Sequence, residues 1–251
     1  MSRATVIQPG RTCSLSLLLG LLRADARSIA RDSLLRWTLL LCVGVFLPML
    51  RWLPPWLNEW LLANYQFDLS PWYPLIQSTC LLIAPVMVGI IGGLMILDQR
   101  DDGVVDAMAV TPLGLKGFLA YRLLLPAVVA LLITLLMLGL VNLAPITPGA
   151  VVLTSLCAAP LAPLLALAIA LLASNKIQGF AIAKANGLLT TPVIVAWFIE
   201  PPAQWAFALL PIYLPVKLCW LSMAGHSWLW LVPISLLGHG LLITWLYRRL
   251  V

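Results

Sequence analysis

Charged side chains are scarce in this sequence. Only 10% of its 251 residues are Asp, Glu, Lys or Arg, whereas 62% are hydrophobic and the mean hydropathy is +1.03. Water-soluble globular domains carry about 25% charged residues, so this chain lies well outside their range. The composition therefore excludes a soluble enzyme or a soluble binding module and indicates a protein that buries its surface in a membrane.

The sequence also lacks the patterns that indicate catalysis or metal binding. Its five cysteines are scattered without a Cys-x-x-Cys pair, and its two histidines, His226 and His239, are far apart. No phosphate loop of the form Gly-x-x-x-x-Gly-Lys-Ser/Thr occurs, because the nearest stretch, Gly114–Gly117, lacks the spacing and the hydroxyl. We therefore expect this chain to have no catalytic residue, no metal ligand and no cofactor, and not to be an enzyme.

Long uncharged runs are present instead. The segments Tyr73–Leu97, Leu123–Leu143 and Ala150–Ala173 contain no charged residue, and each exceeds the roughly 20 helical residues that cross a bilayer core. A further span precedes these runs and contains Arg51. It can cross the membrane only if the long Arg51 side chain extends to the outer membrane surface. The sequence predicts an all-α integral membrane protein with six transmembrane helices, at residues 37–57, 73–97, 123–143, 150–173, 187–210 and 228–247.

The stretch before the last span is interrupted by Glu200-Pro201-Pro202. Prolines break helices, and non-helical backbone inside a membrane persists only where protein or water satisfies it. We therefore expect a re-entrant segment that dips into the outer leaflet. Glu200 and Lys217 flank it and are candidates for an outer gate, or they mark the lipid–water boundary. His239, inside the last span, is a candidate pathway residue.

The placement of basic residues predicts the orientation of the chain. With six spans and both termini in the cytoplasm, only Arg51 and Lys217 of the 15 basic residues lie outside, as the positive-inside rule requires. The net charge of +6 then reflects membrane orientation, and we expect no nucleic-acid partner, because no basic stripe is interleaved with aromatics on a soluble module. The predicted location is the bacterial inner membrane.

Residues 14–33 have the periodicity of an amphipathic helix. Apolar residues share one face, and Arg23, Arg27 and Arg31 share the opposite face. A basic amphipathic helix directly before a span is typical of a helix in the inner-leaflet interface, with its arginines toward lipid phosphates or a cytoplasmic partner. A plain interfacial anchor without a partner remains the alternative.

The loop between the second and third spans predicts a short cytoplasmic helix at residues 100–111. Asp101 and Asp102 suit the dipole at its N-terminus, Gly103 permits a tight entry, and Pro112 disfavours helical geometry at Thr111.

One side of this short helix is apolar. Val104, Met108 and Thr111 lie on that side, with Asp106 opposite. An apolar stripe beneath a membrane protein requires a partner that buries it.

The residues from Arg100 to Leu113 read RDDGVVDAMAVTPL and are followed by Phe118–Arg122. This pattern resembles the coupling-helix signature of ABC type-2 exporter permeases, in which two acids and a glycine precede a further acid and a Thr-Pro pair. The helix at residues 14–33 is similar to the connecting helix of that family, and the six-span layout matches. The half-size permeases of fluoroquinolone and multidrug export are most similar in length and in the VTPL ending.

This resemblance implies a permease subunit that moves an amphipathic small molecule or peptide outward by alternating access, while ATP and Mg are bound by a separate ATPase subunit. It implies a complex with two ATPase copies and a second permease copy, which is either identical to this chain or different from it. Membrane lipid is a further partner. The residues that would contact the ATPase are Arg100, Asp101, Asp102, Gly103, Val104, Asp106, Met108, Thr111 and Pro112.

Two alternatives remain at this point. A haem-exporter-type or lipid- or polysaccharide-exporting ABC permease would share the Asp-Gly loop. An ion-coupled secondary transporter would instead require ionisable residues in mid-span and an internal repeat, of which the sequence offers only His239.

The glycines Gly89, Gly92 and Gly93 also allow two interpretations. Small residues let helices approach closely, either between two permease copies or within one subunit.

Overall fold

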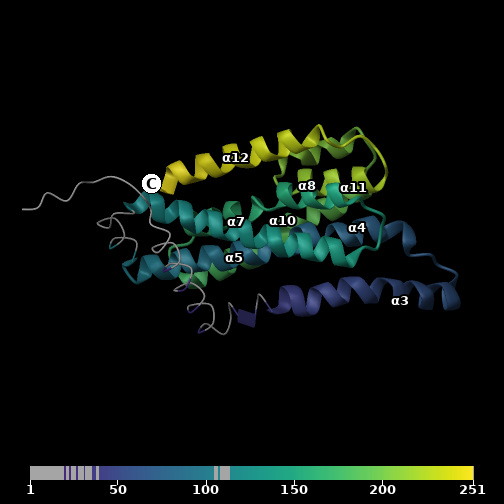
Figure 1. Cartoon of the computed structure of the whole chain (residues 1–251), viewed down its shortest axis with the longest axis horizontal. Coiled ribbons are helices and arrows are strands. Elements are labelled where there is room, and N and C mark those ends of the chain that lie inside the picture. Colours follow the sequence, from purple (N-terminus) through teal and green to yellow (C-terminus); the bar gives the residue numbers. More distant parts are fainter. Residues whose placement is uncertain are drawn as a thin grey trace, which may run out of the picture.

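The computed structural model describes residues 40–104 and 114–250, together with residues 20, 23, 27, 31, 36, 37 and 107. Within these residues every regular element is a helix, and the predicted all-α membrane protein is confirmed (Figure 1). The described elements are η1 (Cys42–Phe46), α3 (Leu47–Tyr65), η2 (Ser70–Trp72), α4 (Tyr73–Ser78), α5 (Cys80–Asp101), α7 (Gly114–Val141), α8 (Pro148–Ala158), α9 (Leu161–Leu172), α10 (Lys176–Trp197), η3 (Ala203–Leu209), α11 (Tyr213–Met223) and α12 (Leu231–Leu250).

Five helical segments in the described part of the chain are long and apolar enough to cross a membrane. They are Ser70–Asp101, Gly114–Val141, Pro148–Leu172, Lys176–Trp197 and Leu231–Leu250.

The expected first span, 37–57, falls on a helix that is continuous from Leu40 through the π-helical η1 to the end of α3. Arg51 within it donates to the carbonyl of Val141 at 3.3 Å. This hydrogen bond satisfies a free carbonyl at the end of α7 and offsets the cost of a cation on a membrane helix. We therefore propose this helix as a sixth crossing.

Two segments differ from the expected boundaries. Where 187–210 was expected, α10 begins at Lys176 and ends at Trp197, before the proline pair, and Asn175 caps its start by accepting from the backbone N–H of Gln178 at 3.0 Å. The expected span 150–173 is divided into α8 and α9 around Pro160, where a proline removes a backbone donor and interrupts the helix.

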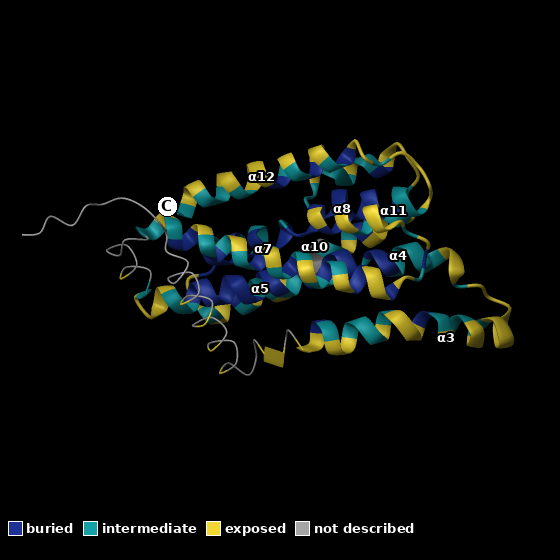
Figure 2. Ribbon diagram, in the orientation of Figure 1, coloured by how far each residue is buried: buried dark blue, intermediate teal, exposed yellow. Residues whose placement is uncertain are grey.

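The helix α5 forms the centre of the bundle and is its most buried long element (Figure 2). It packs most extensively against α9, and glycines make this contact close. A Cβ added at Gly89 would lie 2.7 Å from the carbonyl oxygen of Ala162, and one at Gly93 would lie 2.8 Å from Cβ of Ile169. Gly89 and Gly93 therefore pack helices within one chain, which answers the question left open for them.

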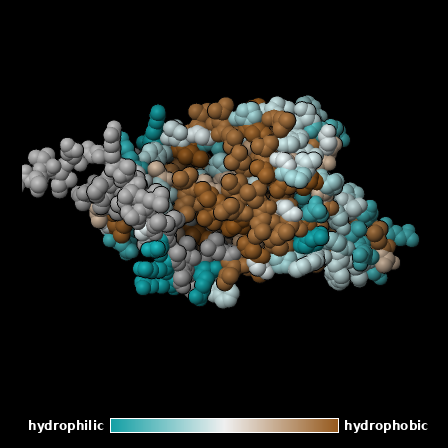
Figure 3. Space-filling view, viewed as in Figure 1, coloured by the Kyte–Doolittle hydropathy of each residue, from teal (hydrophilic) through white to brown (hydrophobic). Residues whose placement is uncertain are grey.

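The surface of the bundle is apolar where lipid would cover it. Figure 3 shows hydrophobic surface across the middle of one face, with hydrophilic residues toward its two ends. On α7 an exposed row recurs every fourth residue and comprises Leu124, Val128, Leu132, Leu136 and Leu140. Such a row is expected of a helix that faces lipid or another membrane helix.

The two ends of the bundle carry different charges. One end, here called the basic end, holds the exits of α5, α9 and α12, where the Tyr247 hydroxyl lies 3.5 Å from the Lys116 carbonyl. Within residues 40–104 and 114–250, its charged residues are Arg100, Lys116, Arg122, Lys176, Lys184, Arg248 and Arg249, with Asp98, Asp101 and Asp102. The opposite end holds Arg51 and Lys217 with Glu59, Asp68 and Glu200.

Candidate functional site

The helix α5 leaves the bundle at the basic end through an acidic turn. Asp101 is its last residue, and Asp102 and Gly103 form a turn in which Gly103 adopts φ +70°. Glycine adopts this left-handed conformation without steric cost. All three residues are exposed, whereas Val104, which begins the next helical stretch, is half-buried.

The rest of the predicted contact lies beyond this turn. The backbone N–H of Ala107 donates to the Gly103 carbonyl at 3.1 Å. Asp106, Met108, Thr111 and Pro112 lie outside the described residues.

Arg100 joins α5 to the end of α9. Its Nη1 and Nη2 lie 3.3 Å and 2.9 Å from the carbonyl oxygens of Ala170 and Ala173. These carbonyls belong to the last turn of α9, which has no intrahelical donors for them and carries a partial negative charge. Hydrogen bonds from charged groups contribute about 1.5–3 kcal/mol. The sequence predicted Arg100 on the ATPase contact, whereas the structure engages its guanidinium within the chain.

A second contact at the basic end joins α5 to α10. Lys176 Nζ lies 2.9 Å from a carboxylate oxygen of Asp98, and each side chain is 35% exposed. Ion pairs with such exposure contribute about 0–1 kcal/mol, so Arg100 is the stronger of the two links. We call Asp98, Arg100, Lys176 and the carbonyls of Ala170 and Ala173 the basic-end clamp. The clamp ties the helix that enters the acidic turn to α9 and α10.

The predicted connecting helix is described at few positions. Arg23, Arg27 and Arg31 are helical and exposed, which leaves their guanidinium groups accessible to phosphates or to a partner. Most of the remaining residues of 14–33 lie outside the described part of the chain.

A short buried helix lies at the opposite end. The helix α11 has 11 residues, about 16 Å at 1.5 Å per residue, which is too short to cross a bilayer. It packs against α8 and α4, and Figure 1 places its label beside α8. The re-entrant path expected for this part of the chain stays a prediction.

Lys217 is buried on this helix, with 7% of its surface exposed. Its Nζ donates to Oε1 of Gln204 and lies 5.5 Å from the centre of the Trp205 ring, while Nε2 of Gln204 donates to the Ala196 carbonyl at 2.7 Å. A buried ammonium requires such partners. Glu200 is exposed on the preceding turn, so the structure does not bring Glu200 and Lys217 together.

Two further hydrogen bonds join distant segments of the chain at this end. The sequence did not predict them. Nε1 of Trp220 donates to Oγ of Ser78 at 3.0 Å, and the backbone N–H of Ala144 donates to Oε1 of Gln77 at 2.6 Å. Both acceptors come from α4 and lie in the interior. In the sequence, only the polar pair Gln77-Ser78 within an apolar run indicates such contacts. Its partners are distant in sequence and could not be predicted.

His239 is buried within α12, where its Nδ1 lies 2.7 Å from the carbonyl oxygen of Ser235. Because a carbonyl only accepts, the proton of this hydrogen bond is on Nδ1. Among the described residues no three His, Cys, Asp or Glu side chains form a group that could hold a metal ion.

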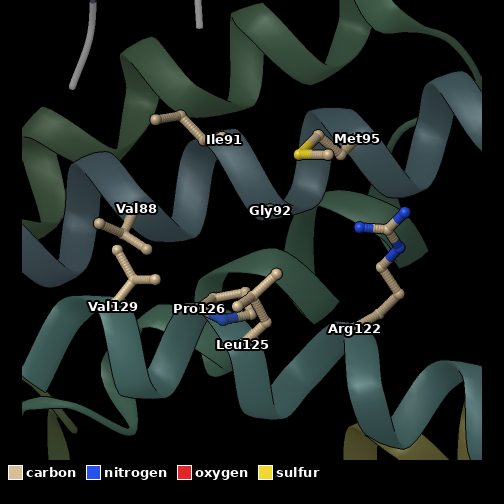
Figure 4. Close-up of a pocket in the computed structure, with 8 residues that line it drawn as sticks. All are labelled: Val88, Ile91, Gly92, Met95, Arg122, Leu125, Pro126 and Val129. Atoms are coloured by element: carbon tan, nitrogen blue, oxygen red, sulfur yellow. The ribbon is translucent and has the colours of Figure 1, made fainter. Parts of the chain in front are cut away.

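A small, partly open groove lies between α5 and α7 (Figure 4). Its lining consists of Val88, Ile91, Gly92, Met95, Arg122, Leu125, Pro126 and Val129. Arg122 was predicted only as one of the cytoplasmic basic residues. The structure buries it, with 4% of its surface exposed.

Comparisons with a family model and with known proteins all find the same family. A family model described as "Fluoroquinolones export permease protein Rv2686c-like" matches residues 25–247. Fluoroquinolones export permease protein Rv2686c of Mycobacterium tuberculosis (strain ATCC 25618 / H37Rv) is 32% identical over 234 residues, which cover 90% of this chain and 91% of the relative. Fluoroquinolones export permease protein MT2760 of strain CDC 1551 / Oshkosh matches to the same extent. No solved structure matches the chain.

Proposed function

Because the chain belongs to the Rv2686c-like family of fluoroquinolones export permease proteins, we propose that it is the membrane-spanning subunit of an ATP-driven ABC exporter. The observation that carries this proposal is the exposed acidic turn of Asp101, Asp102 and Gly103 at the end of the central helix α5. A separate ATPase subunit docks there and holds the ATP and Mg.

The basic end faces the cytoplasm in this proposal. Within residues 40–104 and 114–250, seven basic residues lie toward that end and two toward the opposite end, which is the asymmetry of the positive-inside rule. Both termini are then cytoplasmic, and the protein is a multi-pass component of the bacterial inner membrane. The exposed Arg23, Arg27 and Arg31 lie at the inner leaflet, where lipid phosphates attract arginine.

The docking surface extends from the acidic turn into the following segment. Asp101, Asp102 and Asp106 supply its charge, and Val104, Met108, Thr111 and Pro112 its apolar side. Arg100 acts behind this surface as a positioning residue, because its guanidinium holds the end of α9.

The exporter assembles from two ATPase copies and two permease copies. When ATP closes the ATPase pair, the docked segments move together, and the basic-end clamp passes this motion to α9 and α10. The helix α10 leads to η3 and α11 at the outer end, where Glu200 is exposed ahead of η3 and Lys217 is buried on α11. Alternating access between two such states is sufficient for export.

The proposed cargo is an amphipathic aromatic small molecule, because the relatives are named for export of fluoroquinolones. Peptide, haem and lipid or polysaccharide cargo remain alternatives within the same mechanism. An ion-coupled secondary transporter is the alternative of another class.

Co-purification tests the docking surface. We expect an ABC ATPase to co-purify with the tagged chain from gently solubilised membranes. Asp102→Lys should reduce the recovered ATPase at least about tenfold, which corresponds to 1.4 kcal/mol, because it places a cation where the partner meets an anion.

Glu59→Lys provides the matched control, since it makes the same exchange at an exposed position of the opposite end. We expect this control to retain the ATPase. Equal recovery from both variants would show that the acidic turn is not the docking surface, and absence of any ATPase in several detergents would contradict the proposed function itself.

A further inference from the structure

The helix α12 has a buried face and an exposed face. Ser235 and His239 are buried in the bundle, and Leu250 packs against buried residues of α5 and α9. The opposite face is exposed along the length of the helix (Figure 2). Its apolar residues recur every three or four positions and are Ile234, Leu237, Leu241 and Trp245. This spacing places them in one row on the helix surface, on the side away from the bundle.

The apolar row of α12 ends in two adjacent cations. Arg248 and Arg249 lie in the last turn of the helix and are exposed. Arg248 follows Trp245 by three residues and Leu241 by seven, so it continues the row. In the part of the chain that the structure describes, no acidic side chain pairs with either guanidinium. The end of the row therefore offers two guanidinium groups to an anion from outside the described residues.

Contacts within the chain fix the position of these cations. Cζ of Arg249 lies 4.3 Å from the centre of the Trp245 ring, and cation–π attraction restricts the guanidinium there. Leu250 holds the last turn against α5 and α9. The Tyr247 hydroxyl lies 3.5 Å from the carbonyl oxygen of Lys116, so this exposed residue of α7 adds a third cation beside the turn. Groups that are held in place lose less conformational entropy when they bind a ligand.

The length of the row matches one leaflet of a membrane. Leu237 and Arg248 are separated along α12 by about 16 Å, at 1.5 Å per residue. One leaflet of the hydrocarbon core is about 15 Å thick, half of the roughly 30 Å of a bilayer. A phospholipid whose phosphate meets Arg248 can therefore lay an acyl chain along the row as far as the middle of the membrane. Trp245 then lies near the headgroups, where tryptophan rings of membrane proteins concentrate.

We propose that the last turn of α12 binds an anionic phospholipid, with the phosphodiester on Arg248 and Arg249 and an acyl chain along Leu241 and Leu237. A guanidinium presents its donors in a planar fork that matches a phosphate group, and hydrogen bonds between charged groups are stronger than neutral ones. A zwitterionic lipid brings a cation of its own to the same place, so the site prefers a lipid with net negative charge. This lipid site does not depend on the proposed export function, since it requires only that α12 lies in a bilayer.

Lipid bound at this turn also acts on the basic-end clamp. Leu250 packs against a cluster that contains Ala170, and the carbonyl oxygen of Ala170 accepts from Arg100. A lipid that holds the last turn of α12 in place therefore supports the end of α9. Because a ligand stabilises the state that binds it, we expect phosphatidylglycerol to raise the thermal midpoint of the natural protein more than phosphatidylcholine does.

Lipid titration followed by native mass spectrometry tests this site. The full chain, with its partner subunits if they co-purify, is delipidated in a mild detergent. The dissociation constant of the first bound lipid is measured for phosphatidylglycerol and phosphatidylcholine with the same acyl chains. We expect phosphatidylglycerol to bind at least about tenfold more tightly.

Variants of the two arginines locate the preference. Arg248→Gln and Arg249→Gln should each lower the preference for phosphatidylglycerol, and the two together should remove it. The pair Arg248→Lys and Arg249→Lys keeps both charges and should retain part of it. Lys184→Gln is the matched control for a single arginine, because it removes one charge from an exposed position of α10 at the same end, and should leave the preference unchanged. The thermal midpoint of each variant verifies that it is folded.

Three results for the two lipids would overturn the proposal. They are equal binding of both lipids to the natural protein, an unchanged preference in the folded double glutamine variant, and an equal loss of preference in Arg248→Gln and Lys184→Gln, which would show a response to net charge alone.

Two further results would assign the turn to another occupant. Glycerophosphoglycerol, the headgroup without acyl chains, should bind at least about tenfold more weakly than the lipid. Equal binding of this headgroup would assign the cations to a soluble phosphate ester and reject the lipid site. Loss of a second permease copy from the double glutamine variant, with the lipid preference unchanged, would assign this face of α12 to a contact between subunits.

Discussion

Gly89→Leu is expected to prevent α5 and α9 from packing and to eliminate most of the folded, monodisperse protein. A Cβ at this position would lie 2.7 Å from the carbonyl oxygen of Ala162 and 3.0 Å from Cβ of Leu165. The first of these atoms belongs to the backbone of α9, so rotation of a side chain does not relieve the overlap. Insertion of atoms into a packed core costs about 1–3 kcal/mol and occasionally more, and we expect a loss above about 3 kcal/mol here.

The measurement is the thermal midpoint and the monodisperse fraction after size-exclusion chromatography. Gly139→Leu is the control, because a Cβ at Gly139 meets nothing within 4 Å and this helical glycine is exposed on α7. A Gly89→Leu protein as stable as the Gly139→Leu protein would contradict the close α5–α9 packing described above.

Arg100→Gln is expected to separate ATP hydrolysis from transport. The substitution removes the charged donors from the Ala170 and Ala173 carbonyls, a loss of about 1.5–3 kcal/mol. This corresponds to at least about a tenfold shift in the equilibrium that holds α9 against α5. The acidic turn itself is unchanged, so the ATPase should still co-purify while transport per ATP hydrolysed falls about tenfold.

The ion pair between Lys176 and Asp98, the weaker contact of the basic-end clamp, provides a comparison for Arg100→Gln. Lys176→Gln breaks the ion pair with Asp98, in which both side chains are 35% exposed. It should lower transport per ATP by less than about fivefold, since such pairs contribute about 0–1 kcal/mol. If both variants have the same small effect, Arg100 does not transmit motion. If Arg100→Gln releases the ATPase, Arg100 belongs to the docking surface, as the sequence alone suggested.

Hydropathy and charge were sufficient to predict the membrane class and the apolar helices over the three uncharged runs, because these properties are local in sequence. Contacts between distant residues were not predictable in this way. The sequence showed Arg100 within a recognisable motif but could not show that its guanidinium reaches α9. Likewise, Lys217 was expected as a boundary or gate residue, and only the packing of α11 shows it paired with Gln204 in the interior.

The glycines also show that contacts between distant residues cannot be predicted from sequence alone. Gly89 and Gly93 are suited to close helix contacts in any arrangement, and their sequence spacing does not identify the partner helix. The structure identifies α9 for both. The burial of Arg122 was not predictable either, because nothing in its sequence context separates it from the other basic residues of the predicted cytoplasmic segments.

ATP dependence is the most direct test of the central claim that this chain is the permease of an ATP-driven exporter. Inverted inner-membrane vesicles that contain the chain and its co-purified ATPase are supplied with a fluorescent fluoroquinolone, and accumulation is followed with and without ATP. The account predicts accumulation that requires both ATP and the chain, stops with vanadate and persists when a protonophore removes the proton gradient. Accumulation that proceeds without ATP and is abolished by the protonophore would contradict the account and identify an ion-coupled transporter.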